Sequence, residues 1–195
     1  AILGRDDRLV AKLVDAADKI DANFAAIVGT PVPAVIGTDY KALKRMCEKK
    51  TDLPILAIDT DGMELYDKGE EKAYLALFTA FAKEKYEVCK EKVGILGMTP
   101  QDVSNLKAAD KVREELKKEG KEAICYGMGD GLEAVERASE VGKNIVVSAA
   151  ALEVAKYLEK TFGTPYEIGY PAAGELVPNL DYQGKKILVV HQQVM

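Results

Sequence analysis

Short apolar runs recur along the whole chain, separated by longer segments in which apolar and charged residues alternate. The runs are continuous rather than alternating, as expected for strands that are covered on both faces of a parallel sheet. They lie at residues 24–30, 54–60, 93–99, 122–128, 144–150 and 186–192. Each run has the length of a single strand, and none approaches the roughly 18 residues that cross a membrane.

The segments between these runs carry apolar residues at the three- and four-residue spacing of amphipathic helices. They predict helices around residues 9–20, 40–47, 74–81, 103–116 and 152–162. Thr38 or Asp39 is placed to cap one helix start, and Thr99-Pro100 to begin another. The alternation of strands and helices predicts an α/β fold of Rossmann-like or flavodoxin-like parallel sheet units, with helices on both faces.

The charged stretch at residues 82–92 is the most favourable place for a domain boundary. We therefore expect a first α/β unit at residues 1–88 and a second Rossmann-like unit at residues 89–183. Residues 184–195 then supply the first strand of a further unit that is cut short. Since no helix follows this strand, the sequence indicates a fragment excised from a longer chain; the alternative is a complete domain that ends on a strand.

Composition narrows the classes of function. The 195 residues carry a net charge of −5, which gives no support to a nucleic-acid partner or an anionic membrane surface. The charged start of the chain does not resemble a signal peptide. Three widely spaced cysteines, Cys47, Cys89 and Cys125, form no zinc pattern and are typical of free thiols in the cytoplasm.

Ligands of open parallel sheets bind beyond the carboxyl ends of the strands. One loop at such a place, at residues 126–134, contains Gly127, Gly129 and Gly131. Their spacing is GxGxG, and the next strand ends without the acidic residue that would hold a ribose. A dinucleotide site is therefore disfavoured, and we expect a tight turn whose backbone N–H groups are suited to an anion.

Two other features have alternative interpretations. His191 is the single histidine and is either a surface residue or an acid or ligand at a strand end. Four carboxylates follow the second run: Asp59, Asp61, Glu64 and Asp67. They suit a hard cation, but their spacing is not that of a calcium loop, which favours a solvated loop or helix cap. We predict no metal site, and the residues alone identify no catalytic group.

Several stretches resemble one known family. "VGTPVPAVIGTDYKAL" is similar to a strand, loop and helix of the nitrogenase component 1 family. In that family the strand ends in Thr-Thr-Cys, and apolar residues then lead to Ile-Gly-Asp-Asp. "LPILAIDTDGMELYDKGEEKAYLAL" resembles its next strand, glycine loop and helix. "VGILGMTPQD", "NIVVSAAALEVAKYLEKTFGTPYEIGYP" and "GKKILVVHQQVM" follow in the family's order. The resemblance thus spans most of the chain and implies the family's fold.

The departures from the family pattern bear on function. In the family's nitrogenase chains, a cysteine after the first strand ligates an iron–sulfur cluster, and Pro31 stands at that position. Another cysteine ligates the iron–molybdenum cofactor, and Ser148 stands there. Neither residue supplies a thiolate. The resemblance therefore implies that an iron–sulfur cluster needs ligands outside this fragment, while Thr30, Pro31, Ser148 and the glycine turn border a cofactor or substrate.

Three hypotheses follow. In the first, the chain is part of a nitrogenase-like oxidoreductase that places a metal cofactor or a tetrapyrrole-like substrate for low-potential electron transfer. The resemblance then implies a second homologous chain and an ATP-dependent iron–sulfur reductase as partners, and a fragment that is inactive alone. In the second, the chain is a cofactor-assembly scaffold or carrier. In the third, it is an unrelated two-lobed solute-binding protein.

Overall fold

The computed structural model describes residues 6–103, 105–171 and 183–186. Its chain divides into two compact units, at residues 1–80 and 81–195. Both units combine parallel strands with helices, which confirms the predicted α/β class. No helix in the described ranges is long and apolar enough to cross a membrane.

The first unit is built on two parallel strands, β1 (Ala25–Val28) and β2 (Ile55–Ile58). Helices α1 (Asp6–Ala17) and α3 (Tyr40–Glu48) pack together, and α3 packs on β2. Val10, Ile27 and Leu43 belong to the buried cluster that they share. The prediction that Asp39 caps a helix is confirmed, because its carboxylate accepts a hydrogen bond of 2.9 Å from Ala42 N–H.

A short helix, α2 (Pro31–Val35), follows β1, and α4 (Tyr66–Phe81) follows β2. The sequence TPVP that leads into α2 is extended only at Thr30. Thr30 is extended, as the residue before a proline prefers to be, but Pro31 begins a helix. The first N–H groups of a helix have no partner within it, so prolines in the first turn sacrifice no hydrogen bond.

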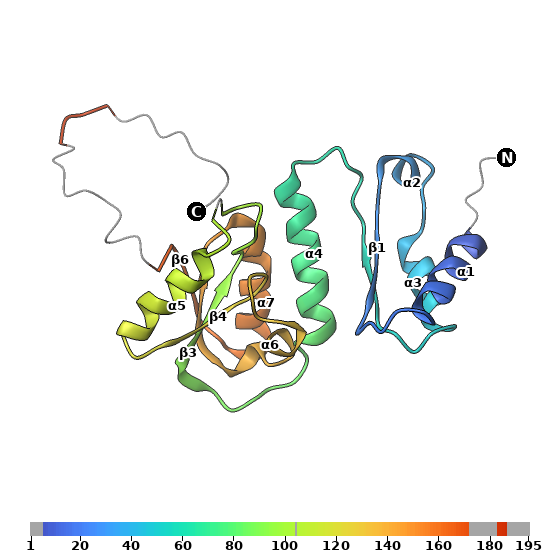
Figure 1. Ribbon diagram of the computed structural model, residues 1–195. Coiled ribbons are helices and arrows are strands. Elements are labelled where there is room, and N and C mark those ends of the chain that lie inside the picture. Colours follow the sequence, from blue (N-terminus) through green and yellow to red (C-terminus); the bar gives the residue numbers. More distant parts are fainter. Residues whose placement is uncertain (1–5, 104, 172–182, 187–195) are drawn as a thin grey trace. The chain divides into compact units, whose positions relative to one another are not determined.

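The second unit contains four parallel strands in the order β4-β3-β5-β6. These are β3 (Cys89–Leu96), β4 (Glu122–Cys125), β5 (Val141–Val146) and β6 (Tyr166–Ile168). Helices α5 (Ala108–Lys118) and α7 (Leu152–Phe162) cover opposite faces of this sheet (Figure 1). Val93, Ile95 and Val112 belong to the core between the sheet and α5.

The structure corrects several predicted bounds. The first half of β3 is the charged stretch Cys89–Lys92, which the sequence suggested as a linker. Helix α5 begins at Ala108 and not near Thr99-Pro100, so Leu106 lies outside it and is exposed. The short strand β6 was not predicted, and the helix expected after the glycine loop is the five-residue α6 (Leu132–Glu136). The predicted strand at 186–192 falls almost entirely outside the described residues, as does His191.

The structure has its own division of the chain, between Ala80 and Phe81. Residues that follow this point are tied to the second unit by side chains of that unit. Ser139 Oγ donates to the Glu84 carbonyl at 2.8 Å and accepts from Tyr86 N–H at 2.9 Å. Tyr157 donates to the carbonyl of Ala82. The proposed bounds of 1–88, 89–183 and 184–195 stay a prediction.

Candidate functional site

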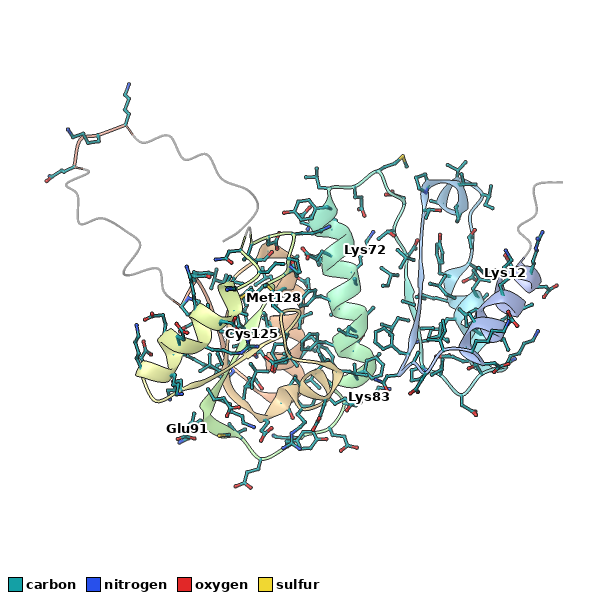
Figure 2. All side chains as sticks on the ribbon, in the orientation of Figure 1. Lys12, Lys72, Lys83, Glu91, Cys125 and Met128 are labelled. Carbon is teal, nitrogen blue, oxygen red and sulfur yellow. The ribbon has the colours of Figure 1, made fainter. Side chains whose placement is uncertain are left out.

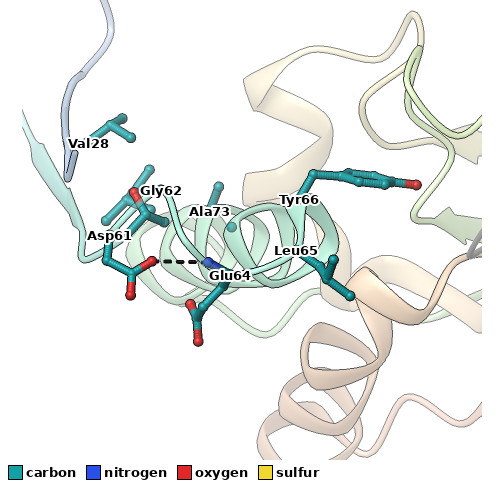
Figure 3. A pocket seen from close by; sticks show the side chains of 10 residues that line it. Val28, Asp61, Gly62, Glu64, Leu65, Tyr66 and Ala73 are labelled. Atoms are coloured by element: carbon teal, nitrogen blue, oxygen red, sulfur yellow. Dashed lines mark hydrogen bonds between the residues drawn. The ribbon is translucent and has the colours of Figure 1, made fainter. Parts of the chain in front are cut away.

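The carboxyl ends of β1 and β2 carry a cleft with an apolar and a polar part. The apolar lobe encloses about 270 Å³ between these strand ends, the loop that follows β2 and the first turns of α4. Figure 3 shows its residues, which include Val28, Leu65, Tyr66 and Ala73. The adjoining polar lobe encloses about 410 Å³. Asp61 and Glu64 line both lobes, which places these two carboxylates where the lobes meet.

The loop after β2 is folded by its own side chains. Asp61 Oδ1 accepts hydrogen bonds from the N–H groups of Met63 and Glu64, at 2.8 and 3.2 Å. These bonds lower the pKa of Asp61, and the bond from Met63 contributes most. Asp61 is therefore ionised at neutral pH. Thr60 donates to the carbonyl of Gly29 at 2.8 Å and so fastens the loop to the end of β1.

One lysine faces the carboxylates of the polar lobe. The Lys72 ammonium, from α4, forms an ion pair with Glu64, and this hydrogen bond raises the pKa of Lys72. Figure 2 labels Lys72 on its helix. Asp59 and Asp61 line the same lobe. The sequence had singled out both carboxylates, but it gave no sign of Lys72, which lies a full helical turn or more along the following helix.

The predicted site residues Thr30 and Pro31 lie beside this cleft. Thr30 is the residue before α2, and Pro31 is its first residue. Gly62 has φ of +72° and packs directly on the proline ring, because a Cβ at Gly62 would lie only 2.9 Å from Cδ and Cγ of Pro31. The structure thus brings Pro31 against the loop that lines the apolar lobe.

In the second unit, the strand order reverses between β3 and β5, and ligands of open α/β sheets bind at such a reversal. Ser148 follows β5 at this point, but its side chain is buried at 1% exposure. Gly97 (φ +87°) approaches it so closely that a Cβ would lie 2.8 Å from Cβ of Ser148. The Ser148 hydroxyl accepts a long bond of 3.4 Å from Ala150 N–H.

The three predicted glycines occupy the turn after β4. Gly127 and Gly129 have φ of 94° and 105°, and Gly131 precedes α6. The conformation of the turn is held by Asp130, whose carboxylate accepts from Cys125 N–H at 2.6 Å and from Arg113 at 2.8 Å. Arg113 also donates to the carbonyl of Met128, and Figure 2 labels Cys125 and Met128. No sequence motif indicated this role of Arg113.

The cysteines offer little to a metal. Cys47 and Cys125 lie in the two hydrophobic cores, and burial raises the pKa of both thiols, that of Cys125 to about 11. Cys89 is half-buried beside Glu91. Over residues 6–103, 105–171 and 183–186, no group of three or more histidine, cysteine or acidic side chains is arranged to hold a metal ion. The residues present at Pro31 and Ser148 do not fit an iron–sulfur cluster.

Comparison with solved structures gives the same fold. Two structures titled nitrogenase Cp1, at pH 6.5 and at pH 5, align with a TM-score of 0.70 and 20% sequence identity. They cover 84% and 86% of this chain, but only 32% and 34% of the nitrogenase chains. This chain therefore spans about a third of their length. A sequence search of curated proteins gave no significant match.

A family model assigns the sequence independently of the fold comparison. The model for nitrogenase component 1 type oxidoreductases matches residues 1–172, which is most of the chain. This agrees with the resemblance seen in the loops after the first two strands and in the second unit. It also displaces the hypothesis of an unrelated solute-binding protein. The chain belongs to the nitrogenase component 1 type oxidoreductase family.

Proposed function

We propose that this chain is part of a nitrogenase-like oxidoreductase component, in which it helps to place a metal cofactor or a tetrapyrrole-like substrate for low-potential electron transfer. The observation that carries the proposal is the cleft at the carboxyl ends of β1 and β2, in a chain of this family. It lies where α/β sheets bind ligands, and the predicted site residue Pro31 packs against one of its loops.

The contribution of these residues is to bind and shield a ligand. Val28, Ile58 and Ala73 provide an apolar wall that excludes water, while Asp61 and Glu64 fix orientation at one end. In such enzymes the bound group carries the chemistry, and the protein positions it. An iron–sulfur cluster requires thiolate ligands from outside the described residues, since Pro31 and Ser148 offer none.

The partners belong to the same proposal. Members of the family work in multi-chain assemblies, and this chain spans about a third of the nitrogenase chains that it matches. We therefore infer a second homologous chain that completes the site, and an ATP-dependent iron–sulfur reductase that delivers electrons. On this proposal, residues 1–195 alone are inactive, because the remaining parts of the site lie elsewhere.

A second candidate is a cofactor-assembly scaffold or carrier of the same family. The replacement of both expected cysteines, by Pro31 and Ser148, favours it, because a scaffold that passes its cargo on needs no permanent thiolate ligand. The two candidates differ in turnover. The oxidoreductase reduces a bound substrate repeatedly, whereas the scaffold releases its cargo unchanged.

Anaerobic purification separates these candidates. The full-length protein is expressed together with its neighbouring gene products, and iron, sulfide and visible absorbance are measured on the isolated complex. The oxidoreductase is expected to contain iron and sulfide and to accept electrons from an iron–sulfur reductase only with ATP. A complex with iron but without turnover indicates the scaffold. An intact complex without iron, sulfide or visible absorbance contradicts the oxidoreductase proposal.

A further inference from the structure

Both positions at which the family resemblance places a cysteine ligand have become packing contacts. Pro31 lies against Gly62, and Ser148 lies against Gly97, with contacts too close for any side chain on either glycine. Both glycines also have positive φ, which side chains rarely adopt. Among the described residues of the first unit, the two-lobed cleft provides an open volume.

The apolar lobe is suited to an organic molecule. Its volume of about 270 Å³ is close to the lower end of the range of about 300–1,000 Å³ that small-molecule pockets span. Val28 and Leu65 line it and remain 57% and 67% exposed. Burying these side chains under an apolar ligand is favourable, because it removes apolar surface from water.

The polar lobe carries an excess of negative charge. The described residues that line it include three carboxylates, Asp59, Asp61 and Glu64, and one ammonium group, that of Lys72. Lys72 is already paired with Glu64. Asp61 uses Oδ1 for two backbone N–H groups, which leaves its second oxygen for a ligand.

A buried hydroxyl provides independent support. Tyr40 lines the polar lobe, is only 7% exposed, and its hydroxyl has no hydrogen-bond partner among the described residues. A buried polar group without a partner is costly, and a ligand that brings a donor or acceptor to this hydroxyl would remove that cost.

We propose that this cleft binds an organic cation, with its apolar body in the lobe formed by Val28, Ile58 and Ala73 and its charged N–H group against Asp61. The proposal rests on the proposed function in placing a ligand at this edge of the first unit, and of the ligands named there it selects an organic substrate with a cationic N–H group over a metal cofactor. A carboxylate-bearing ligand meets two excess negative charges here, and a thiolate-ligated cluster finds no thiolate.

The test uses the full-length protein and two probes with the same ring, 2-naphthylmethylammonium and 2-naphthoate, in calorimetric titrations at low salt. The cation is expected to bind at least about tenfold more tightly than the anion, because two excess carboxylates attract one and repel the other. Equal affinities, or a preference for naphthoate, overturn the proposal.

Two variants locate the site. Asp61→Asn keeps an acceptor for the N–H groups of the loop but removes the charge, and should reduce the preference to about threefold or less. Ala73→Leu fills the apolar lobe and should weaken binding of both probes about tenfold. Asp15→Asn and Ala11→Leu, on the exposed side of α1, are the matched controls. They should change neither the preference for the cation nor the affinity for the two probes. Unchanged binding in Asp61→Asn places the probe elsewhere and overturns the proposal.

The same preparation separates this inference from the proposed function. An enzyme that accepts electrons but shows no preference for the cation contradicts the inference alone. A protein that binds the cation in this cleft but contains no iron, sulfide or visible absorbance contradicts the proposed oxidoreductase function alone.

Discussion

Gly94 and Asn144 are paired residues of β3 and β5, and the pair makes a strong test of the second unit. A Cβ at Gly94 would overlap Oδ1 of Asn144 and would lie 3.0 Å from Cε2 of Tyr126. Asn144 is fully buried, so its amide cannot move aside into solvent. Gly94→Ala should therefore lower the free energy of unfolding by about 1–3 kcal/mol, the usual cost of overpacking a core.

The second substitution should relieve the first. Neither Oδ1 nor Nδ2 of Asn144 has a hydrogen-bond partner among the described residues. Asn144→Ala removes two desolvated polar atoms, a gain of about 1–3 kcal/mol that a small cavity offsets, so the net change should stay within about 1 kcal/mol. In the Asn144→Ala background the new methyl of Gly94→Ala no longer overlaps Oδ1 and keeps only its tight contact with Tyr126. We expect a coupling energy of about 1–2 kcal/mol between the two sites.

The assay is urea unfolding of the wild type, both single variants and the double variant, followed by circular dichroism, with midpoints compared at constant slope. Gly131→Ala is the control, since no atom lies within 4 Å of its added methyl. It should cost less than about 1 kcal/mol, the loss of a favourable residue before a helix. Additive effects of Gly94→Ala and Asn144→Ala, within about 0.5 kcal/mol, would refute the argument.

Three further predictions concern the second unit. Asp130→Ala removes the partner of Arg113 and of Cys125 N–H, and should cost about 2–4 kcal/mol in urea unfolding; a loss below about 1 kcal/mol contradicts this. Ser139→Ala should cost about 1–3 kcal/mol by the same assay, and a neutral result contradicts the role of its two hydrogen bonds. Burial raises the pKa of Cys125 from 9.0 to about 11, so the folded state holds this proton more tightly, and the free energy of unfolding should fall between pH 9 and pH 11. In Cys125→Ser the contribution of this thiol to that decrease should be absent. Identical pH profiles of the unfolding free energy in the variant and the wild type contradict this prediction.

Much of the fold follows from local sequence pattern. The apolar runs predicted β1, β2, β4 and the second half of β5, and Asp39 marked the start of α3. The predicted strand bounds were wrong where a strand is partly exposed. The charged half of β3 at Cys89–Lys92 lacks an apolar run, yet it pairs with β5 at Cys89 and with β4 at Lys92. Hydrophobicity therefore locates the buried part of a strand, while strand pairing determines its length.

The α/β class, the family and the absence of thiolates at Pro31 and Ser148 all follow from the sequence alone. The tertiary structure alone revealed that the two prolines after β1 begin a helix, that Pro31 packs on Gly62, and that Lys72 faces the carboxylates of the loop after β2. The physical reason is the distance along the sequence over which each kind of interaction acts. Strand and helix preferences act between neighbours in sequence, whereas the cleft depends on contacts such as Thr60 with Gly29, which are 31 residues apart. Only the packed chain brings such groups together.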